Sequence, residues 1–177
     1  MPDAIFEPLV RAARLRNLNF LVIGGYAVAA HGYPRTTYDI DIVVCHDEIE
    51  AWRETVIQLG YREIHHDKTF VQFNHPTDAL LNLDIMHVSR DTFDKMQSEK
   101  RDLASANEKI GVVSLKHLVA LKCHAVRHGS PSRNIKDLTD LIHLIDNNKL
   151  DITGPEWRDL IRSHGGDDTY EKLRPKQ

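Results

Sequence analysis

The chain has 177 residues, of which 41% are hydrophobic and 28% charged, and its formal net charge is −3. This composition predicts a chain that buries a sizeable core, and it excludes a disordered or strongly basic nucleic-acid-binding class. The two cysteines, Cys45 and Cys123, lack the spacing of a disulfide framework or a zinc site, and no segment resembles a signal peptide or a membrane span. We therefore expect a soluble, cytoplasmic protein with no membrane partner.

The first elements combine an apolar run with two glycines. The sequence predicts a helix near 4–17 and a strand at 19–23, whose apolar residues lead directly to Gly24 and Gly25. Glycine lets a backbone turn sharply and approach a ligand closely. The helix-tolerant segment 26–31 follows, so we expect the turn to open a short helix whose free N–H groups favour a phosphate.

Three aspartates lie inside apolar runs. Strand alternation in the predicted strand 39–44 places Asp39 and Asp41 on one face, and a second strand-like run at 81–88 supplies Asp84. Each aspartate alone could simply end a strand or cap a helix. Three negative charges on one half-buried face cost several kcal/mol unless cations neutralise them, which indicates a site for paired Mg²⁺ ions.

The elements between these aspartates predict a mixed sheet. A helix at 48–58 carries an apolar stripe, and the strand-like run 69–74 is separated from the Asp84 strand by turn residues at 75–78. A short turn between two strands is typical of an antiparallel pair. We expect an α+β fold with a mixed, largely antiparallel sheet flanked by helices.

The second half of the chain is predicted to be helical. A helix begins after Ser114, a candidate N-cap, and runs to Gly129, and a second helix spans 133–147. Residues 153–156 have capping-box spacing and predict a third helix, while the polar tail 164–177 is expected to be loosely held.

Charge is unevenly distributed along the chain. Acidic residues outnumber basic ones over 36–64, whereas 109–136 contains six basic residues and no acidic one. This pattern favours a clamp for a magnesium triphosphate or for an RNA backbone, and a solvated helix face is the alternative for most of these bases. His124 and His128 share a helix face but lack the glutamate of the zinc-protease motif, so surface or substrate-contacting roles are favoured over a zinc site.

The sequence resembles the nucleotidyltransferase superfamily that includes DNA polymerase beta. The resemblance rests on Gly-Gly-Tyr-Ala-Val-Ala-Ala-His-Gly-Tyr-Pro-Arg-Thr-Thr-Tyr-Asp-Ile-Asp at residues 24–41 and Leu-Asp-Ile at 83–85, and it covers about residues 18–146. The motif looks most like the AbiEii-type minimal nucleotidyltransferases of bacterial toxin and phage-defence systems. The resemblance implies a catalytic core at 1–113 and a helical C-terminal part at 114–177, and a cognate antitoxin is a possible partner.

The resemblance also implies a reaction and a set of site residues. Two Mg²⁺ or Mn²⁺ ions would assist transfer of a nucleoside monophosphate from an NTP to an acceptor, with release of pyrophosphate. Asp39 and Asp41 would hold the metals, and Asp84 would bind one of them and orient or deprotonate the acceptor. The nucleotide would contact residues of the glycine turn, the following loop and the helical half: Gly24, Gly25, Arg35, Thr36, Thr37, Lys122, Lys136 and Asp137.

Several alternatives remain open from the sequence. Arg35 and its neighbours equally suit a polar loop after Pro34, and Asp137 suits an i,i+4 pair with Arg133. The acceptor could be tRNA or protein, which we favour, or a small molecule such as an aminoglycoside. A binding module that keeps the fold without chemistry is the remaining hypothesis.

Overall fold

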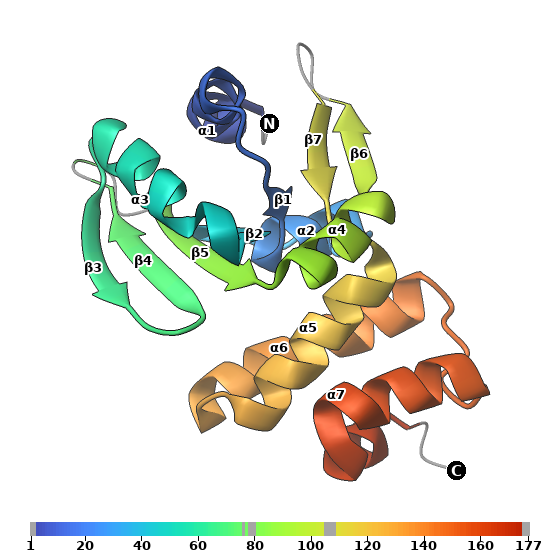
Figure 1. Cartoon of the computed structure of the whole chain (residues 1–177). Coiled ribbons are helices and arrows are strands. Elements are labelled where there is room, and N and C mark those ends of the chain that lie inside the picture. Colours follow the sequence, from blue (N-terminus) through green and yellow to red (C-terminus); the bar gives the residue numbers. More distant parts are fainter. Residues whose placement is uncertain (1–2, 76, 78–80, 105–108, 175–177) are drawn as a thin grey trace. The chain divides into compact units, whose positions relative to one another are not determined.

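The computed structural model describes residues 3–75, 77, 81–104 and 109–174, and its chain divides into two compact units (Figure 1). Residues 1–27 and 35–114 form the first unit, and residues 28–34 and 115–177 form the second. The division at Ser114 lies next to the expected domain boundary.

The first unit is built on a seven-stranded sheet of order β3-β4-β5-β2-β1-β7-β6. Four of its six strand pairs are antiparallel, while β2 with β5 and β1 with β7 run parallel, which confirms the mixed, largely antiparallel sheet. The strands are β1 (Leu21–Val22), β2 (Asp39–Cys45), β3 (Arg62–His66), β4 (Phe70–Asn74), β5 (Asn82–Val88), β6 (Arg101–Ala104) and β7 (Lys109–Val112).

Helices complete the first unit. They are α1 (Asp3–Arg16), α2 (Gly24–Ala30, which crosses the unit boundary), the 3₁₀ turn η1 (His46–Glu48), α3 (Ile49–Gln58) and α4 (Arg90–Ser98). The expected helices near 4–17 and 48–58 and the strand containing Asp39 are confirmed. The sequence analysis did not predict β3, α4, β6 or β7. The expected turn at 75–78 falls partly outside the described residues.

The central strands β2 and β5 bury one face and half-expose the other. Ile40, Ile42, Leu83 and Ile85 are fully buried, and the alternate positions toward the start of each strand are only partly buried. Successive side chains of a strand point to opposite faces, so the apolar set forms the core and the intervening polar set remains accessible. This alternation positions the aspartates.

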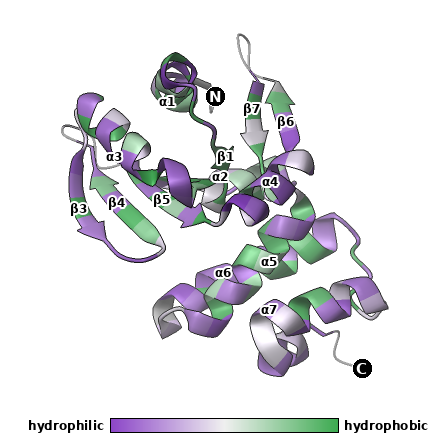
Figure 2. Ribbon diagram, in the orientation of Figure 1, coloured by the Kyte–Doolittle hydropathy of each residue, from purple (hydrophilic) through white to green (hydrophobic). Residues whose placement is uncertain are grey.

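The second unit is helical, as expected, and consists of α5 (Leu115–His128), α6 (Pro131–Asn147) and α7 (Pro155–Leu173). Figure 2 shows hydrophobic and hydrophilic residues on the same helices, the pattern of amphipathic helices that pack around a shared core. Buried members of that core are Val119, Cys123, Val126, Leu141, Ile145, Ile152, Ile161, Tyr170 and Leu173. The amides of Asn147 and Asn148 donate to the carbonyls of Gly32 and His31, at 2.8 and 2.9 Å, which ties segment 28–34 to α6.

Two expectations for the C-terminal part are wrong. The tail from His164 is not loosely held, because α7 continues to Leu173 past a kink at Gly166 and buries Tyr170 and Leu173 in the helical core. Thr153 does not open a capping box either. Gly154 is the N-cap of α7. The Thr153 hydroxyl instead donates to the Asp151 carboxylate at 2.6 Å, and the same carboxylate accepts the backbone N–H groups of Thr153 and Gly154, which forms a local turn.

Candidate functional site

The parallel pairing of β2 with β5 brings two of the three predicted aspartates side by side. Asp41 is the register partner of Asp84, and Asp39 is paired with Asn82 two residues earlier on the same face. Neighbouring strands lie about 4.8 Å apart, so the Asp41 and Asp84 side chains leave the sheet next to each other. Both strands thus present their carboxylates on one accessible face.

The backbone at Gly24 packs directly on the Asp41 carboxylate. Gly24 has a φ of +61°, and a Cβ atom there would overlap the Asp41 side chain, whose nearest atom is a carboxylate oxygen. Only glycine combines this backbone conformation with this close approach. The expected glycine turn therefore lies against the expected metal-binding strand.

The loop residues predicted to contact nucleotide lie against the next glycine, Gly25. A Cβ at Gly25 would lie 2.5 Å from Thr37 Oγ1 and 3.2 Å from Arg35 Nη1. Arg35 Nη1 also donates to the Thr36 carbonyl at 3.1 Å, and Thr37 Oγ1 donates to the Asp39 carbonyl at 3.4 Å. Gly25, the 35–37 loop and the start of β2 therefore form one continuous patch in the first unit.

Gln72 on β4 is a site neighbour that the sequence analysis missed. It is the register partner of Asp84, and its side-chain amide donates to both Asp84 carboxylate oxygens at 3.1 Å. On its other side Gln72 is paired with His65 of β3. Alternation within the run 69–74 places Gln72 on the polar face of its strand, but only the strand pairing shows that Gln72 and Asp84 lie side by side on the same face of the sheet.

The donor chemistry of this face suits a hard cation, because carboxylate oxygens are the ligands that Mg²⁺ prefers. Among residues 3–75, 77, 81–104 and 109–174, no three His, Cys, Asp or Glu side chains already converge on one point at metal-binding distance. The strand register brings Asp39, Asp41 and Asp84 to neighbouring positions, and their action as metal ligands stays a prediction.

The three predicted site residues of the helical half have two different environments. Lys122 is 8% exposed, and its Nζ lies 2.6 Å from Asp137 Oδ1 and 2.7 Å from Asp140 Oδ2, inside the second unit. Asp137 is therefore paired with Lys122 rather than with Arg133. Lys136 is exposed. The sequence analysis missed Asp140, which lies one helical turn after Asp137 and so faces the same lysine. Contact of Lys122, Lys136 and Asp137 with nucleotide stays a prediction.

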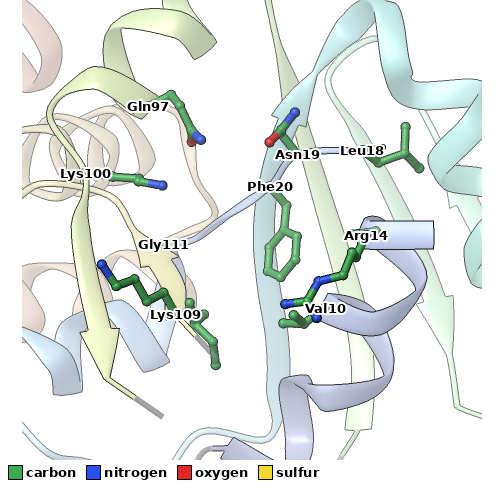
Figure 3. Close-up of a pocket in the computed structure, with 11 residues that line it drawn as sticks. Val10, Arg14, Leu18, Asn19, Phe20, Gln97, Lys100, Lys109 and Gly111 are labelled. Atoms are coloured by element: carbon green, nitrogen blue, oxygen red, sulfur yellow. The ribbon is translucent and has the colours of Figure 1, made fainter. Parts of the chain in front are cut away.

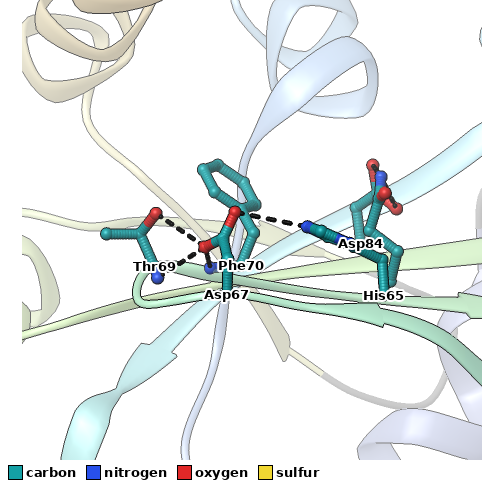
Figure 4. A network of polar contacts seen from close by, with 6 residues as sticks. His65, Asp67, Thr69, Phe70 and Asp84 are labelled. Atoms are coloured by element: carbon teal, nitrogen blue, oxygen red, sulfur yellow. Dashed lines mark hydrogen bonds and ion pairs between the residues drawn. The ribbon is translucent and has the colours of Figure 1, made fainter.

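Two further polar features lie in the first unit. Asp67, in the turn between β3 and β4, accepts from the backbone N–H groups of Thr69 and Phe70 at 2.8 and 2.9 Å (Figure 4). These hydrogen bonds lower the pKa of Asp67 to about 2, and the contact with His65 acts in the same direction. Asp67 is therefore a local turn-stabilising carboxylate.

A pocket of about 240 Å³ carries basic side chains (Figure 3). Arg14, Lys100 and Lys109 line it together with the ring of Phe20. The two lysines share one counter-charge, since their Nζ atoms lie 3.5 and 3.7 Å from the carboxylate of Asp102. This pocket adds positive charge to the first unit without joining the aspartate face.

The remaining candidates from the sequence are placed as follows. His124 and His128 lie on α5 with ring centroids 4.4 Å apart.

Cys45 and Cys123 are both buried and free. Burial raises the pKa of the Cys123 thiol to about 12, so it is held protonated at neutral pH. None of the described helices has the length and apolar character needed to cross a membrane.

The fold has several relatives of known structure. ANT(2")-Ia in complex with adenylyl-2"-tobramycin superimposes with a TM-score of 0.64 and 15% identity, over 90% of this chain and 94% of that one. The lincomycin-bound lincosamide antibiotic adenylyltransferase LnuA gives 0.57 and 13%, over 80% and 97%. An antigenic nucleotidyltransferase-like protein from Paracoccidioides brasiliensis gives 0.55 and 17%, over 97% and 91%.

Sequence comparisons add nothing to this likeness. No protein-family model matches the chain, and no curated protein matches it significantly. Identities of 13–17% support a shared architecture alone. The sheet, its aspartate-bearing parallel pair and the helical second unit are together the nucleotidyltransferase fold.

Proposed function

We propose that this protein is a Mg²⁺-dependent nucleotidyltransferase that moves a nucleoside monophosphate from an NTP to an acceptor and releases pyrophosphate. The observation that carries the proposal is the register of β2 with β5, which sets Asp41 beside Asp84 while Gly24 packs on the Asp41 carboxylate. A close backbone approach and paired carboxylates on one accessible sheet face suit a metal-bound triphosphate. Similarity of fold to antibiotic adenylyltransferases supports the same reaction class.

Each aspartate has a distinct role in the proposal. Asp39 and Asp41 hold the two Mg²⁺ ions, and Asp84 is the third ligand and accepts the proton of the attacking group. Bound Mg²⁺ supplies positive charge that stabilises the phosphoryl oxygens as charge develops. The Gln72 amide donates to both oxygens of Asp84 and so fixes the orientation of that carboxylate.

The nucleotide contacts are proposed on two grounds. Gly24, Gly25, Arg35, Thr36 and Thr37 are next to Asp39 and Asp41 within the first unit, where backbone N–H groups, a guanidinium and hydroxyls can donate to phosphate oxygens. For the helical half, the resemblance to AbiEii-type proteins alone supports contacts from Lys122, Lys136 and Asp137, in a C-terminal part that follows a catalytic core at residues 1–113.

Two acceptor classes follow from different observations. The AbiEii-type motif favours tRNA or protein as the acceptor, in a system where a cognate antitoxin controls the enzyme. The likeness to ANT(2")-Ia and LnuA favours a small-molecule acceptor instead. A catalytically silent nucleotide-binding or partner-binding module of the same fold is the alternative outside the enzyme class.

One experiment separates these possibilities. The protein is incubated with each α-labelled NTP, with Mg²⁺ or Mn²⁺, in parallel reactions containing total tRNA, a panel of aminoglycosides and lincosamides, or protein alone. Asp41→Asn is the control, because it removes a charge from the proposed metal site while keeping the volume of the side chain. We expect label in one fraction and its near-complete loss with Asp41→Asn, while circular dichroism shows both proteins folded.

The outcomes identify the acceptor or reject the enzyme. Labelled tRNA or protein would support the toxin-like assignment, and a labelled drug would support the antibiotic-modifying one. Full turnover by Asp41→Asn would show that the metal assignment is wrong. Saturable Mg²⁺-dependent NTP binding with no labelled product would favour the binding module.

A further inference from the structure

Three histidines from separate segments surround an open cleft in the first unit. The cleft has a volume of about 880 Å³ and lies away from the aspartates along β2 and β5, at the ends of both strands. His46 follows β2, His66 ends β3, and His87 lies near the end of β5. Three carboxylates and one lysine also line the cleft: Asp47, Glu50, Asp67 and Lys68.

The sheet register explains why these segments meet. His87 is paired with Val44, two residues before His46, so both histidines reach the same end of the parallel pair. The His87 backbone N–H donates to the Thr69 carbonyl at 2.9 Å, which holds the β3–β4 turn against β5. His66 immediately precedes that turn. The three histidines therefore come together because β2, β3 and β5 belong to one sheet.

The contact between two of the imidazoles has the geometry of a chelating pair. His46 Nδ1 lies 2.9 Å from His87 Nδ1, with ring centroids 4.9 Å apart. Two nitrogens that each bind Zn²⁺ at 2.0–2.1 Å in a tetrahedral site lie about 3.3 Å apart. Binding one ion would need an increase of a few tenths of an ångström in this separation, transfer of the shared proton from Nδ1 to Nε2 or to solvent, and rotation of both rings so that each Nδ1 lone pair faces the ion.

One ring of the pair is buried and the other is exposed. His87 is 5% exposed, so its ring is held in place at the end of β5. Neutral imidazole is the species that binds transition metals. The cleft carboxylates Asp47 and Glu50 are already paired with Arg90 and Arg53, so the ring nitrogens carry the site.

We propose that His46, His66 and His87 form a site for a divalent transition-metal ion such as Zn²⁺, separate from the aspartate face. His46 and His87 are the preformed pair. In the described part of the chain, no third ligand already lies within metal-binding distance of this pair. The exposed side chain of His66 would therefore have to turn toward the pair to supply the third ligand. The ion would join the ends of β2, β3 and β5. This inference does not depend on the proposed transfer activity.

The test measures Zn²⁺ binding directly, without NTP. Protein stripped with a chelator is titrated with Zn²⁺ against a chromogenic competitor, in millimolar Mg²⁺ to occupy the aspartate face, and thermal melting is followed in parallel. We expect one Zn²⁺ per chain, an increase in Tm, and affinity at least about 10-fold weaker in His46→Ala and in His66→Ala. His87 is left unchanged because a buried truncation there could unfold the sheet.

The matched control is His124→Ala, which disrupts the other histidine pair of the chain on α5. It should bind Zn²⁺ as tightly as the unmodified protein. Loss of binding in His124→Ala with retention in His46→Ala would overturn the proposal, as would absence of Zn²⁺ binding. Retention in His66→Ala with loss in His46→Ala would overturn the three-histidine assignment.

Discussion

Two pairs of aspartates, one in each unit, occupy opposite environments. On the sheet of the first unit, Asp41 and Asp84 are neighbours on a half-exposed face. Between α5 and α6 of the second unit, Asp137 and Asp140 are 4% and 0% exposed and both lie within 2.7 Å of Lys122 Nζ. The first set is accessible on the sheet face, and the second encloses the lysine cation.

Buried aspartates and accessible aspartates have different effects on stability. A buried charge destabilises a protein by several kcal/mol unless a partner compensates it, so the Lys122 cluster has to be closed for the second unit to fold. Accessible carboxylates can remain solvated until a ligand arrives. The comparison therefore assigns the Lys122 cluster a structural role, beside its predicted contact with nucleotide, and leaves the aspartate face available for chemistry.

The largest expected effect is on the closed cluster. Lys122→Met removes the cation that two buried carboxylates share, so we expect the free energy of unfolding to fall by about 3–5 kcal/mol in urea denaturation. The matched control Lys136→Met, at an exposed position of α6, should change it by less than about 0.5 kcal/mol. Equal effects of the two substitutions would remove the distinction between closed and open aspartates.

The second prediction concerns the backbone that packs on the open face. Gly24→Ala adds a Cβ that overlaps the Asp41 carboxylate at a positive φ, so we expect a loss of about 2–4 kcal/mol of stability together with loss of the proposed activity. Gly32→Ala is the control, since Gly32 also has a positive φ, of 99°, but a Cβ there would lie 3.9 Å from the Asn147 side chain, an ordinary contact distance. It should cost about 1–2 kcal/mol. A Gly24→Ala protein as stable as the control would disprove the close approach.

The third prediction tests the orientation of Asp84. Gln72→Leu removes the amide that donates to both Asp84 oxygens, a charge-assisted contact of about 1.5 kcal/mol. We expect the rate constant of transfer to fall about 10-fold and the free energy of unfolding to fall by no more than about 1.5 kcal/mol. Gln58→Leu, on the exposed end of α3, serves as the control. An unchanged rate would show that Gln72 has no positioning role.

The smallest expected effect is pH-dependent and concerns an aspartate that belongs to neither set. The pKa of Asp67 is lowered from 3.8 to about 2 by backbone N–H donors, so its ionised form stabilises the folded state. The stabilisation is complete above the unfolded-state pKa and is lost as the pH falls from about 4 to 2. Melting curves of Asp67→Asn should therefore lie below those of the unmodified protein at pH 6 and converge with them near pH 2.

Asp94→Asn, on an exposed face of α4, is the control for the pH series. Its melting temperature should follow that of the unmodified protein across the same range. A gap between the Asp67→Asn and unmodified proteins that persists at pH 2 would show that the turn does not depend on the ionised carboxylate.

The sequence determined the local parts of the candidate site. Alternation in Asp39-Ile40-Asp41-Ile42 predicts one buried and one accessible face, and the structure has both. The glycines after an apolar strand predict a turn, and Gly24 has the required positive φ. These features depend on chain neighbours a few residues apart, so periodicity and backbone preference are sufficient to predict them.

Only the tertiary structure decided which distant residues meet. The pairing of Gln72 with Asp84, the burial of Lys122 against Asp140, and the contact of His46 with His87 join residues 12 to 41 positions apart. Strand register and helix packing are set by how all the apolar faces are buried together, and that information is not contained in any single segment. Local pattern therefore predicted which residues are candidates for chemistry, and packing decided which of them are accessible and which are closed inside the fold.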